Sequence, residues 1–412
     1  METLLSLKLV LELTLFLFAE AHTCTNIIPA SNTYGINLHN HDPTPAALDQ
    51  MMNAGLTTYR IDGFDWINME FSPNKYNLTG YNQVIPLFQT RGLRVITGIG
   101  HTPPPFYNGS IYSKSTQAGL IKMYAALSKQ YSDVMWEFTN EPNDNVLWEN
   151  NASGFTLLAK QICQAIHRNS ASNECVGPST AFISRKFKDF DWLQQTFEHG
   201  LLDHIDAILV HPYRADAPET AIPDFHMLRQ LVDSYSPLDK TIQIYNGEWG
   251  YSNNPSGSPS ITLEEQAILT ARVFLVSHMI SDGLSIWYDW MDGGNELMGL
   301  VHNDNTPKPS YYATKTLARM TNDTSFIVRI PTFQDGATTD DEYVLKFENI
   351  TTSKIVLAAW SLSGFPHVSR LPGGRGCYDV FDLYGNSLEK ICEDSRGLHL
   401  NLTQSPMYLI SK

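Results

Sequence analysis

The sequence is poor in charge and has no cluster of basic residues. Only 17% of its 412 residues are Asp, Glu, Lys or Arg, below the roughly 25% of an average domain, and the formal net charge is −15. An acidic chain without a Lys/Arg cluster is a poor binder of polyanions, which argues against nucleic acid as a partner. Beyond the N-terminus, no apolar stretch approaches the roughly 20 residues that span a bilayer. We find neither internal repeats nor low-complexity linkers.

Cysteine is scarce, and its spacing suits no zinc site. The five cysteines include no Cys-X2-Cys pair. Cys163 is close in sequence to Cys175, as Cys377 is to Cys392, and we predict a disulfide within each pair. Cys24 is left over.

The N-terminus predicts entry into the secretory pathway. Residues 13–19 are almost entirely apolar and small residues flank position 20, so we predict a signal peptide over residues 1–21. Lys8 and Glu12 are unusual in such a segment, and a buried N-terminal helix is the alternative. Six Asn-X-Ser/Thr triplets favour a secreted or lysosomal glycoprotein. Their asparagines are Asn77, Asn108, Asn151, Asn322, Asn349 and Asn401.

Between residues 34 and 320, short apolar runs alternate with segments of helical spacing. Near-continuous apolar strands are typical of parallel sheets buried on both faces, and the alternation predicts βαβ units. Eight such units indicate an α/β fold, a (β/α)8 TIM barrel over residues 25–322. A doubly wound open sheet is the alternative, but the glycine-rich turn it normally carries after its first strand is missing. The predicted strands are Tyr34–Leu38, Thr57–Ile61, Arg94–Thr97, Val134–Phe138, Cys175–Ser179, Ala207–Val210, Thr241–Tyr245 and Leu284–Tyr288.

From about residue 325 the pattern changes to short strands separated by turn residues. We predict a small all-β sandwich domain over residues 325–412. Its aromatic residues form no visible row, which favours a role in supporting the barrel; a dedicated glycan-binding domain is the alternative. The predicted strands are Phe326–Ile330, Tyr343–Phe347, Ile355–Trp360, Tyr378–Asp382, Leu398–Leu402 and Met407–Ile410.

Two glutamates follow predicted strands at the C-terminal face of the barrel, where TIM-barrel enzymes place their function. The run VMWEFTNEPN continues the fourth strand into Asn140 and Glu141, and TIQIYNGEWG carries Glu248 just past the seventh. Barrel closure would bring both carboxylates to one mouth. Paired carboxylates suit cleavage of a glycosidic bond, where one protonates the leaving oxygen and the other attacks the sugar carbon or activates water.

The segments WEFTNEPN and IYNGEWGYS resemble the clan A glycoside hydrolases, whose acid/base follows Asn at the end of strand four and whose nucleophile ends strand seven. Three further segments resemble strands two, six and eight of these enzymes: GLTTYRIDGFDW with Arg60, DAILVHPYR with His211 and Tyr213, and LSIWYDWMDGG with Trp287. Within the clan the chain is most similar to families 5 and 39. The resemblance implies a retaining mechanism, which places the two carboxyl groups about 5–5.5 Å apart.

The resemblance also implies a role for each matched residue. Glu141 is the general acid/base, so its pKa is expected to be raised, and Glu248 is the nucleophile, which must stay ionised. Arg60 and Tyr213 can donate hydrogen bonds to this nucleophile, and Asn140 can bind the sugar 2-hydroxyl. The predicted substrate-binding residues are Arg60, His101, Asn140, His211, Tyr213 and Trp287.

Structural roles are the alternatives for several of these residues. Glu141 can cap a helix, and His211 can be a satisfied core histidine. Trp287 can belong to the barrel core, with Trp290 facing the substrate instead. Arg60 can pair with a nearby aspartate, at position 62 or 65.

Further polar residues lie beside the same predicted strand ends. His101 departs from the usual family segment because it stands in GIGHTPPPF. His39 and His41 follow the first strand and are possible substrate contacts. We predict no metal there, since no third ligand converges from sequence. Asp289 and Asp292 are expected to serve loop structure or distal sugar contacts.

The leading hypothesis is a secreted or lysosomal retaining glycosidase acting on a β-linked oligo- or polysaccharide. No cofactor is expected, because two carboxylates suffice for the reaction. A site that binds uronic acids is expected to have several basic residues nearby. Only Arg60 and Arg214 are strong candidates for this role, so we expect a neutral glycan. The competing class is a catalytically silent carbohydrate-binding protein on a glycosidase scaffold, and the presence of both carboxylates argues against it.

Overall fold

The computed structural model describes residues 28–39, 43–100, 102–107, 110–144, 148–183, 189–257, 260–294, 296–334, 337–372 and 376–411. The predicted signal peptide, Cys24, His41, His101 and Asn108 lie outside these ranges. In the described part of the chain, no helix is both long enough and apolar enough to cross a membrane.

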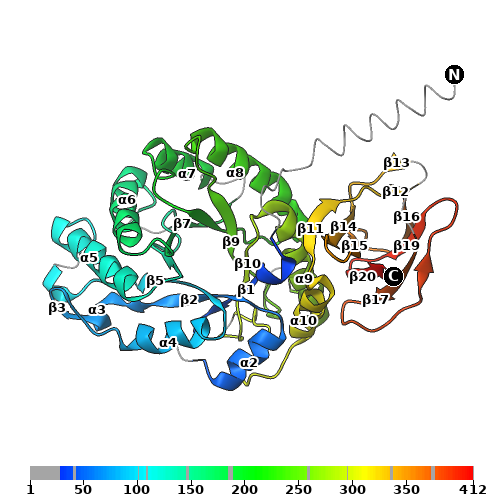
Figure 1. Ribbon diagram of the computed structural model, residues 1–412, viewed down its shortest axis with the longest axis horizontal. Coiled ribbons are helices and arrows are strands. Elements are labelled where there is room, and N and C mark those ends of the chain that lie inside the picture. The colour runs from blue at the N-terminus through cyan, green and yellow to red at the C-terminus, as the bar shows by residue number, and fades with distance from the viewer. Residues whose placement is uncertain are drawn as a thin grey trace.

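Eight parallel strands close into a barrel, and helices surround it (Figure 1). Each predicted strand overlaps one barrel strand, which confirms the TIM barrel. The order around the barrel is β1-β10-β9-β8-β7-β6-β5-β2. The strands are β1 (Tyr34–Leu38), β2 (Thr58–Asp65), β5 (Arg94–Gly100), β6 (Val134–Glu137), β7 (Glu174–Ala181), β8 (Ala207–His211), β9 (Gln243–Trp249) and β10 (Ser285–Trp287).

Several helices begin at a short polar side chain that caps them. Ser113 accepts a hydrogen bond from the third residue after it at the start of α5, and Asn151 does the same for α6. Thr262 and Glu265 form a reciprocal capping box at the start of α9. The α-helices are α2 (Pro45–Asn53), α3 (Trp66–Met69), α4 (Thr79–Gln89), α5 (Lys114–Gln130), α6 (Ala152–Asn169), α7 (Asp189–Glu198), α8 (Ile222–Tyr235), α9 (Leu263–Ile280) and α10 (Pro309–Thr321).

Short elements fill the connections of the barrel. A small hairpin, β3 (Glu70–Ser72) and β4 (Lys75–Tyr76), follows α3. Three 3-10 turns are η1 (Ala30–Asn32), η2 (Pro105–Tyr107) and η3 (Pro218–Ala221).

The inside of the barrel divides into an apolar part and a polar part. Side chains from six strands form a buried apolar cluster, which includes Ile96, Met135 and Leu209. Later positions of the same and neighbouring strands carry buried polar groups instead, among them Glu137 and Glu248. These positions lie toward the C-terminal ends of the strands, so the polar groups gather at the face where this fold carries its sites.

The C-terminal domain is built from two antiparallel sheets, as predicted for a sandwich. Leu398, Leu400 and Leu402 alternate along one strand toward a buried cluster shared by both sheets. The six-stranded sheet has the order β11-β14-β15-β20-β17-β18, and the four-stranded sheet the order β13-β12-β16-β19. The strands are β11 (Ser325–Arg329), β12 (Phe333–Gln334), β13 (Ala337–Thr338), β14 (Glu342–Asn349), β15 (Lys354–Ser361), β16 (His367–Leu371), β17 (Cys377–Phe381), β18 (Ile391–Cys392), β19 (Leu398–Leu402) and β20 (Met407–Ser411).

The other face of the six-stranded sheet packs against the barrel, and α9 and α10 lie between them (Figure 1). Trp360 donates its indole N–H to Glu219 Oε1 at 2.7 Å. Arg272 of α9 pairs with both oxygens of this carboxylate at 2.8 and 2.5 Å. Tyr343 stacks on Trp360 with ring centroids 5.1 Å apart. Since both aromatic rings are buried in this interface, they offer no glycan-binding surface, which favours the supporting role of the domain.

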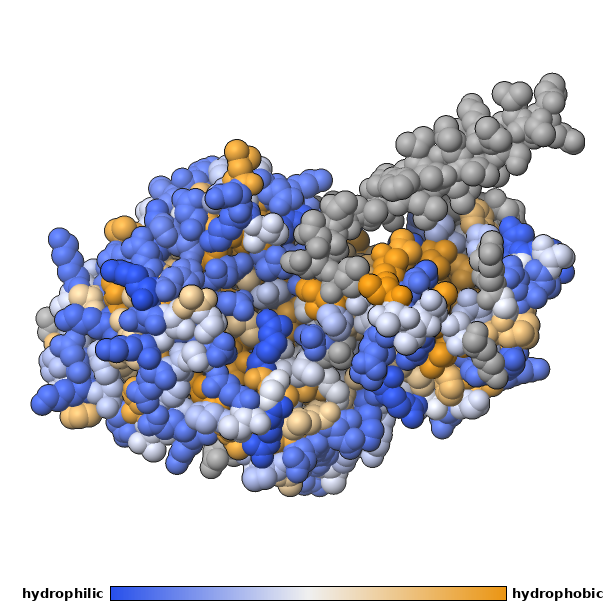
Figure 2. Space-filling model, viewed as in Figure 1, coloured by the Kyte–Doolittle hydropathy of each residue, from blue (hydrophilic) through white to orange (hydrophobic). Residues whose placement is uncertain are grey.

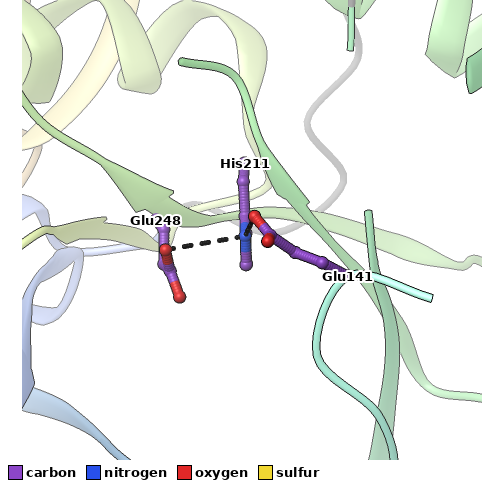
Figure 3. Close-up of side chains that lie close together, drawn as sticks. All are labelled: Glu141, His211 and Glu248. Atoms are coloured by element: carbon purple, nitrogen blue, oxygen red, sulfur yellow. Dashed lines mark hydrogen bonds and ion pairs between the residues drawn. The ribbon is translucent and has the colours of Figure 1, made fainter. Parts of the chain in front are cut away.

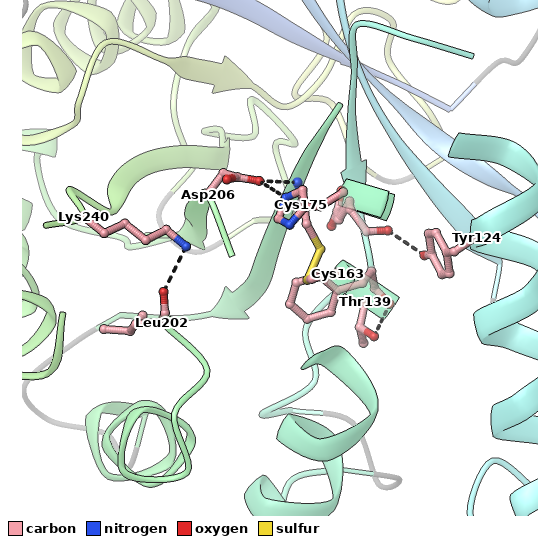
Figure 4. Close-up of a disulfide and its surroundings, with 10 residues drawn as sticks. Tyr124, Thr139, Cys163, Cys175, Leu202, Asp206 and Lys240 are labelled. Carbon is pink, nitrogen blue, oxygen red and sulfur yellow. Dashed lines mark hydrogen bonds and ion pairs between the residues drawn. A yellow bond between two sulfur atoms is a disulfide. The ribbon is translucent and has the colours of Figure 1, made fainter. Parts of the chain in front are cut away.

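Both predicted disulfides are present. Cys163 of α6 bonds to Cys175 of β7, and Cys377 bonds to Cys392 between β17 and β18. Figure 4 shows the first bridge beside Asp206, whose carboxylate accepts the backbone N–H of Cys175 at 2.7 Å. The bridge therefore ties an outer helix to a barrel strand.

Hydrophilic side chains cover most of the face of the barrel in Figure 2, and apolar side chains gather where the two domains meet. Among the predicted glycosylation sites, Asn77, Asn322 and Asn401 are exposed. Asn151 and Asn349 are half-buried. Modification at these positions stays a prediction.

Candidate active site

Glu141 lies just beyond β6, on a turn that the neighbouring strand holds in place. Its backbone is in the left-handed region with φ of +45°, which is unusual for a residue with a side chain. The Glu141 N–H donates to Ser179 O at 2.7 Å. Two residues on, Asn143 exchanges two hydrogen bonds of 2.9 Å with the backbone of Ala181. The turn is therefore fixed to the end of β7.

Glu248 lies near the end of β9 and is 8% exposed. Tyr213 donates its hydroxyl to Glu248 Oε2 at 2.9 Å, and Arg60 donates to Oε1. Both contacts match the roles predicted for Arg60 and Tyr213 as donors to this carboxylate. Hydrogen bonds from a cation and from a phenol stabilise the ionised form of a carboxylate.

His211 lies between the two glutamates (Figure 3). Its Nδ1 is 2.9 Å from Glu141 Oε1 and 3.6 Å from Glu248 Oε2. One atom from each of the three residues lies within 4.8 Å of the other two. The two carboxylates that are 107 positions apart in the sequence therefore meet at one mouth, as predicted.

These three side chains offer atoms of the kind that bind metal ions, but their hydrogen bonds serve another purpose. Both oxygens of Glu248 already accept bonds from protein donors. His211 Nδ1 is directed at the Glu141 carboxylate. This arrangement orients two carboxylates toward each other, as acid–base and nucleophilic chemistry requires.

Arg60 is fully engaged by the protein. A guanidinium has five N–H donors, and all five are used here. Two go to Glu137 at 2.7 and 2.9 Å, one each to Asn37 and Asn140 at 2.8 Å, and one to Glu248. With no donor left for a sugar, Arg60 is not a substrate contact, and this part of the sequence prediction is wrong. Its role is to hold the Glu248 carboxylate.

Glu137 is a site residue that the sequence analysis missed. It faces the barrel interior from the last position of β6 and is 6% exposed. Its bidentate pair with Arg60 balances the buried cation. The signal was present, since Glu137 is a lone charged residue in an otherwise apolar strand.

The expectation of a raised pKa for Glu141 is wrong for the free site. Partial burial raises the pKa of this carboxyl, but the hydrogen bond and charge of His211 outweigh burial and lower it. Glu141 is therefore held as a carboxylate when no sugar is bound. Protonation for acid catalysis must overcome this contact.

Asn140 is placed to contact substrate, whereas His211 is not. Asn140 is exposed at the mouth, and its Oδ1 accepts from Arg60 at 2.8 Å. This bond orients its amide NH2 group, which can then donate to a sugar. His211 is fully buried, so it acts on the carboxylates and not as an exposed sugar contact.

The aromatic surface of the site differs from the prediction. Trp287 is 0% exposed and donates to Met298 O at 2.8 Å, so it presents no face to a sugar and belongs to the barrel core. Trp290, the alternative, is also buried. The rings that line the mouth are Tyr213 and Tyr288, whose centroids are 6.1 Å apart, and Phe182, 6.5 Å from Tyr213.

A second set of polar side chains surrounds Tyr288 at the ends of β10, β1 and β2. His39 Nδ1 is 2.5 Å from Asp62 Oδ2, and its Nε2 is 2.6 Å from the Tyr288 hydroxyl. Asp289 Oδ2 is 3.6 Å from the same Nε2. We call His39, Asp62, Tyr288 and Asp289 the outer group. We call Asn37, Arg60, Glu137, Asn140 and Glu248 the inner network.

Comparison with known proteins agrees with this fold. Residues 21–294 match the model of the cellulase family, glycosyl hydrolase family 5. No curated protein matches the sequence significantly.

Solved structures share the fold at low identity. A family 39 glycoside hydrolase from Bacteroides cellulosilyticus WH2 superposes with a TM-score of 0.77 at 20% identity, covering 94% of this chain and 82% of that one. A glucosidase from Croceicoccus marinus has a TM-score of 0.64 at 14% identity, covering 92% and 96%. A family 30 subfamily 8 xylanase from Clostridium acetobutylicum has a TM-score of 0.60 at 15% identity, covering 92% and 95%. Since the family model spans more than half of the chain, this protein belongs to glycosyl hydrolase family 5 and is a clan A glycoside hydrolase.

Proposed function

We propose that this protein is a retaining β-glycosidase that hydrolyses a neutral oligo- or polysaccharide by double displacement. The observation that carries the proposal is the meeting of Glu141 and Glu248 at the barrel mouth, bridged by His211. Glu248 has the donors that keep a nucleophile ionised, and His211 orients Glu141 toward it. A silent carbohydrate-binding scaffold would have no use for this arrangement.

In the first step, Glu248 attacks the anomeric carbon while Glu141 gives its proton to the leaving oxygen. The glycosidic bond breaks, and a glycosyl ester forms on Glu248. In the second step, Glu141 takes a proton from water, and the water oxygen attacks the same carbon. The ester breaks and Glu248 is restored as a carboxylate, so two inversions give retention.

The spacing of the carboxylates supports retention over inversion. Oxygens of Glu141 and Glu248 lie within 4.8 Å of each other. Retaining enzymes place these groups about 5–5.5 Å apart, whereas inverting enzymes leave about 6.5–9.5 Å for a water molecule. The short separation suits direct attack by Glu248.

The engagement of the basic residues supports a neutral substrate. Arg60 has no donor left for a uronate, as shown above. Arg214 donates to Pro212 O, Thr220 and Asp224, and packs over the Trp249 ring at 5.6 Å. Neither guanidinium is available for a sugar carboxylate.

The secretory pathway is the compartment we propose. Two disulfides suit an oxidising environment, and the exposed sequons suit a glycoprotein. The lowered pKa of Glu141 suits work in an acidic lumen, because acid catalysis needs this group protonated.

A panel of 4-nitrophenyl β-glycosides, measured beside Glu248→Gln, tests the proposal. We expect the wild type to release nitrophenol from at least one neutral β-glycoside and Glu248→Gln to release none. Nuclear magnetic resonance of the first sugar product should show the β-anomer before mutarotation. Undiminished turnover by Glu248→Gln, or an α-anomer as first product, would contradict the mechanism.

A further inference from the structure

Asp289 is a carboxylate that is almost completely buried at the mouth of the site. It is the second residue after β10, and its side chain is 9% exposed. Its closest charged neighbour is His39 Nε2, at 3.6 Å from Oδ2, beyond the length of a good hydrogen bond. No described residue donates a hydrogen bond to this carboxylate. Buried carboxylates normally have such donors, so this one lacks the partners that burial calls for.

The neighbours of Asp289 are already committed to other partners. His39 is 2.5 Å from Asp62 and 2.6 Å from the Tyr288 hydroxyl. Tyr288 in turn donates to Glu296 at 3.1 Å. Burial raises the pKa of Asp289 to about 7, and His39 offsets only part of this rise. The donors for Asp289 must therefore come from outside the described protein.

Tyr288, which precedes Asp289 in the chain, lies near the nucleophile and indicates which ligand brings those donors. The Tyr288 ring lies 6.1 Å from the ring of Tyr213, which bonds to Glu248. A sugar whose anomeric carbon faces Glu248 would extend its hydroxyl groups over Tyr288. Sugar hydroxyls are donors, and a carboxylate can accept from two of them at once.

The charges around this position also select among sugars. The outer group itself carries the carboxylates of Asp62 and Asp289, and the charges of Glu296 and Glu248 also act on it. Among the basic groups, His39 pairs with Asp62, and Lys308, which acts on Asp289 from a distance, pairs with Asp292. A sugar that carries its own carboxylate would meet like charges here, which disfavours binding.

We propose that Asp289 is the specificity residue for the glycone, the sugar on the nucleophile side: it accepts hydrogen bonds from hydroxyl groups of a neutral pyranose. The inference rests on the proposed glycosidase function and deepens it. It gives Asp289 a direct sugar contact in place of a structural role in the loop.

The test compares Asp289→Ala and Asp289→Asn with the wild type on 4-nitrophenyl β-D-glucoside and its 3-, 4- and 6-deoxy analogues. Loss of a hydrogen bond to a charged group is expected to lower kcat/KM about 10- to 100-fold for Asp289→Ala. Asp289→Asn, which keeps an acceptor oxygen, should fall between. One deoxy analogue should be a poor substrate for the wild type and lose nothing further in Asp289→Ala. Asp304→Asn, an exposed aspartate in the same connection, is the matched control and should change nothing.

Thermal unfolding separates this role from a structural one. Because Asp289 lacks donors in the free protein, both variants should unfold at the wild-type temperature or above it. A lower unfolding temperature, with the same loss of kcat/KM on every analogue, would overturn the inference.

Binding of 1-deoxynojirimycin, measured by calorimetry, answers the same question without turnover. The affinity should fall about 10- to 100-fold in Asp289→Ala; an unchanged affinity would overturn the inference. A wild type that binds this compound but cleaves no glycoside would contradict the proposed function and leave the specificity role supported.

Discussion

The inner network and the outer group meet at the same mouth, and they differ in how many of their hydrogen bonds the protein itself supplies. In the inner network, the five donors of Arg60 all reach acceptors from four other side chains. In the outer group, Asp289 is buried with no donor among the described residues. A guanidinium with all its donors engaged holds the nucleophile rigidly before substrate arrives, whereas a buried carboxylate without donors leaves its acceptors for a ligand.

The largest expected effect comes from the centre of the inner network. Glu248→Gln keeps the shape of the side chain but removes the attacking carboxylate, so kcat should fall about 10⁴-fold or more. Steady-state kinetics with an activated aryl glycoside measures it, and circular dichroism checks the fold. A loss below tenfold would remove Glu248 from the chemistry.

Breaking the charge balance of the inner network should cost stability. Glu137→Gln leaves the buried guanidinium of Arg60 without its bidentate partner, and removing one member of a buried pair destabilises a protein by about 3–5 kcal/mol. Urea unfolding provides the measurement. A change under 1 kcal/mol would show that water or rearrangement compensates and that the network is less closed than its contacts indicate.

His211, which contacts Glu141 and lies near Glu248 of the inner network, should control the pH dependence of activity. Since its hydrogen bond lowers the pKa of Glu141, the activity that needs protonated Glu141 should be present at acidic pH and decline as pH rises through this lowered pKa. His211→Phe removes the contact while burial remains, so the alkaline limb of kcat/KM should move to higher pH. A limb that stays in place, or moves to lower pH, would show that His211 does not control this proton.

The smallest expected effect lies in the outer group. His39 and Asp62 are both about half exposed, and ion pairs of this kind contribute about 0–1 kcal/mol. Asp62→Asn should therefore change the unfolding free energy by less than about 1 kcal/mol. A loss comparable to that of Glu137→Gln would erase the distinction between the two sets.

The fold and the catalytic pair were predictable because each rests on a local pattern. Apolar runs such as Val134–Phe138 identify barrel strands by composition alone, and a carboxylate just after a strand marks the functional face. Both disulfides followed from short sequence separations. The sequence analysis missed strand β16. Its buried residues include Ser369, between Val368 and Arg370, so the sequence shows no regular alternation of apolar and polar residues.

What escaped prediction depends on how side chains share partners in space. All five donors of Arg60 are engaged because acceptor atoms from several strands converge on it. The spacing of residues in the sequence does not reveal this convergence. Trp287 and Tyr288 are adjacent, and only the turn of the chain after β10 decides that the indole is buried and the phenol faces the mouth. The pKa of Glu141 is lowered by its contact with His211. This contact could not be predicted, because the two residues are 70 positions apart in the sequence.

The most direct measurement of the central claim uses Glu141→Ala with an aryl β-glycoside whose leaving group needs no acid. We expect this variant still to form the glycosyl–enzyme, to turn over slowly, and to be accelerated by azide to give a β-glycosyl azide. An α-glycosyl azide, or full activity without azide, would contradict the assignment of Glu141 as acid/base in a retaining mechanism.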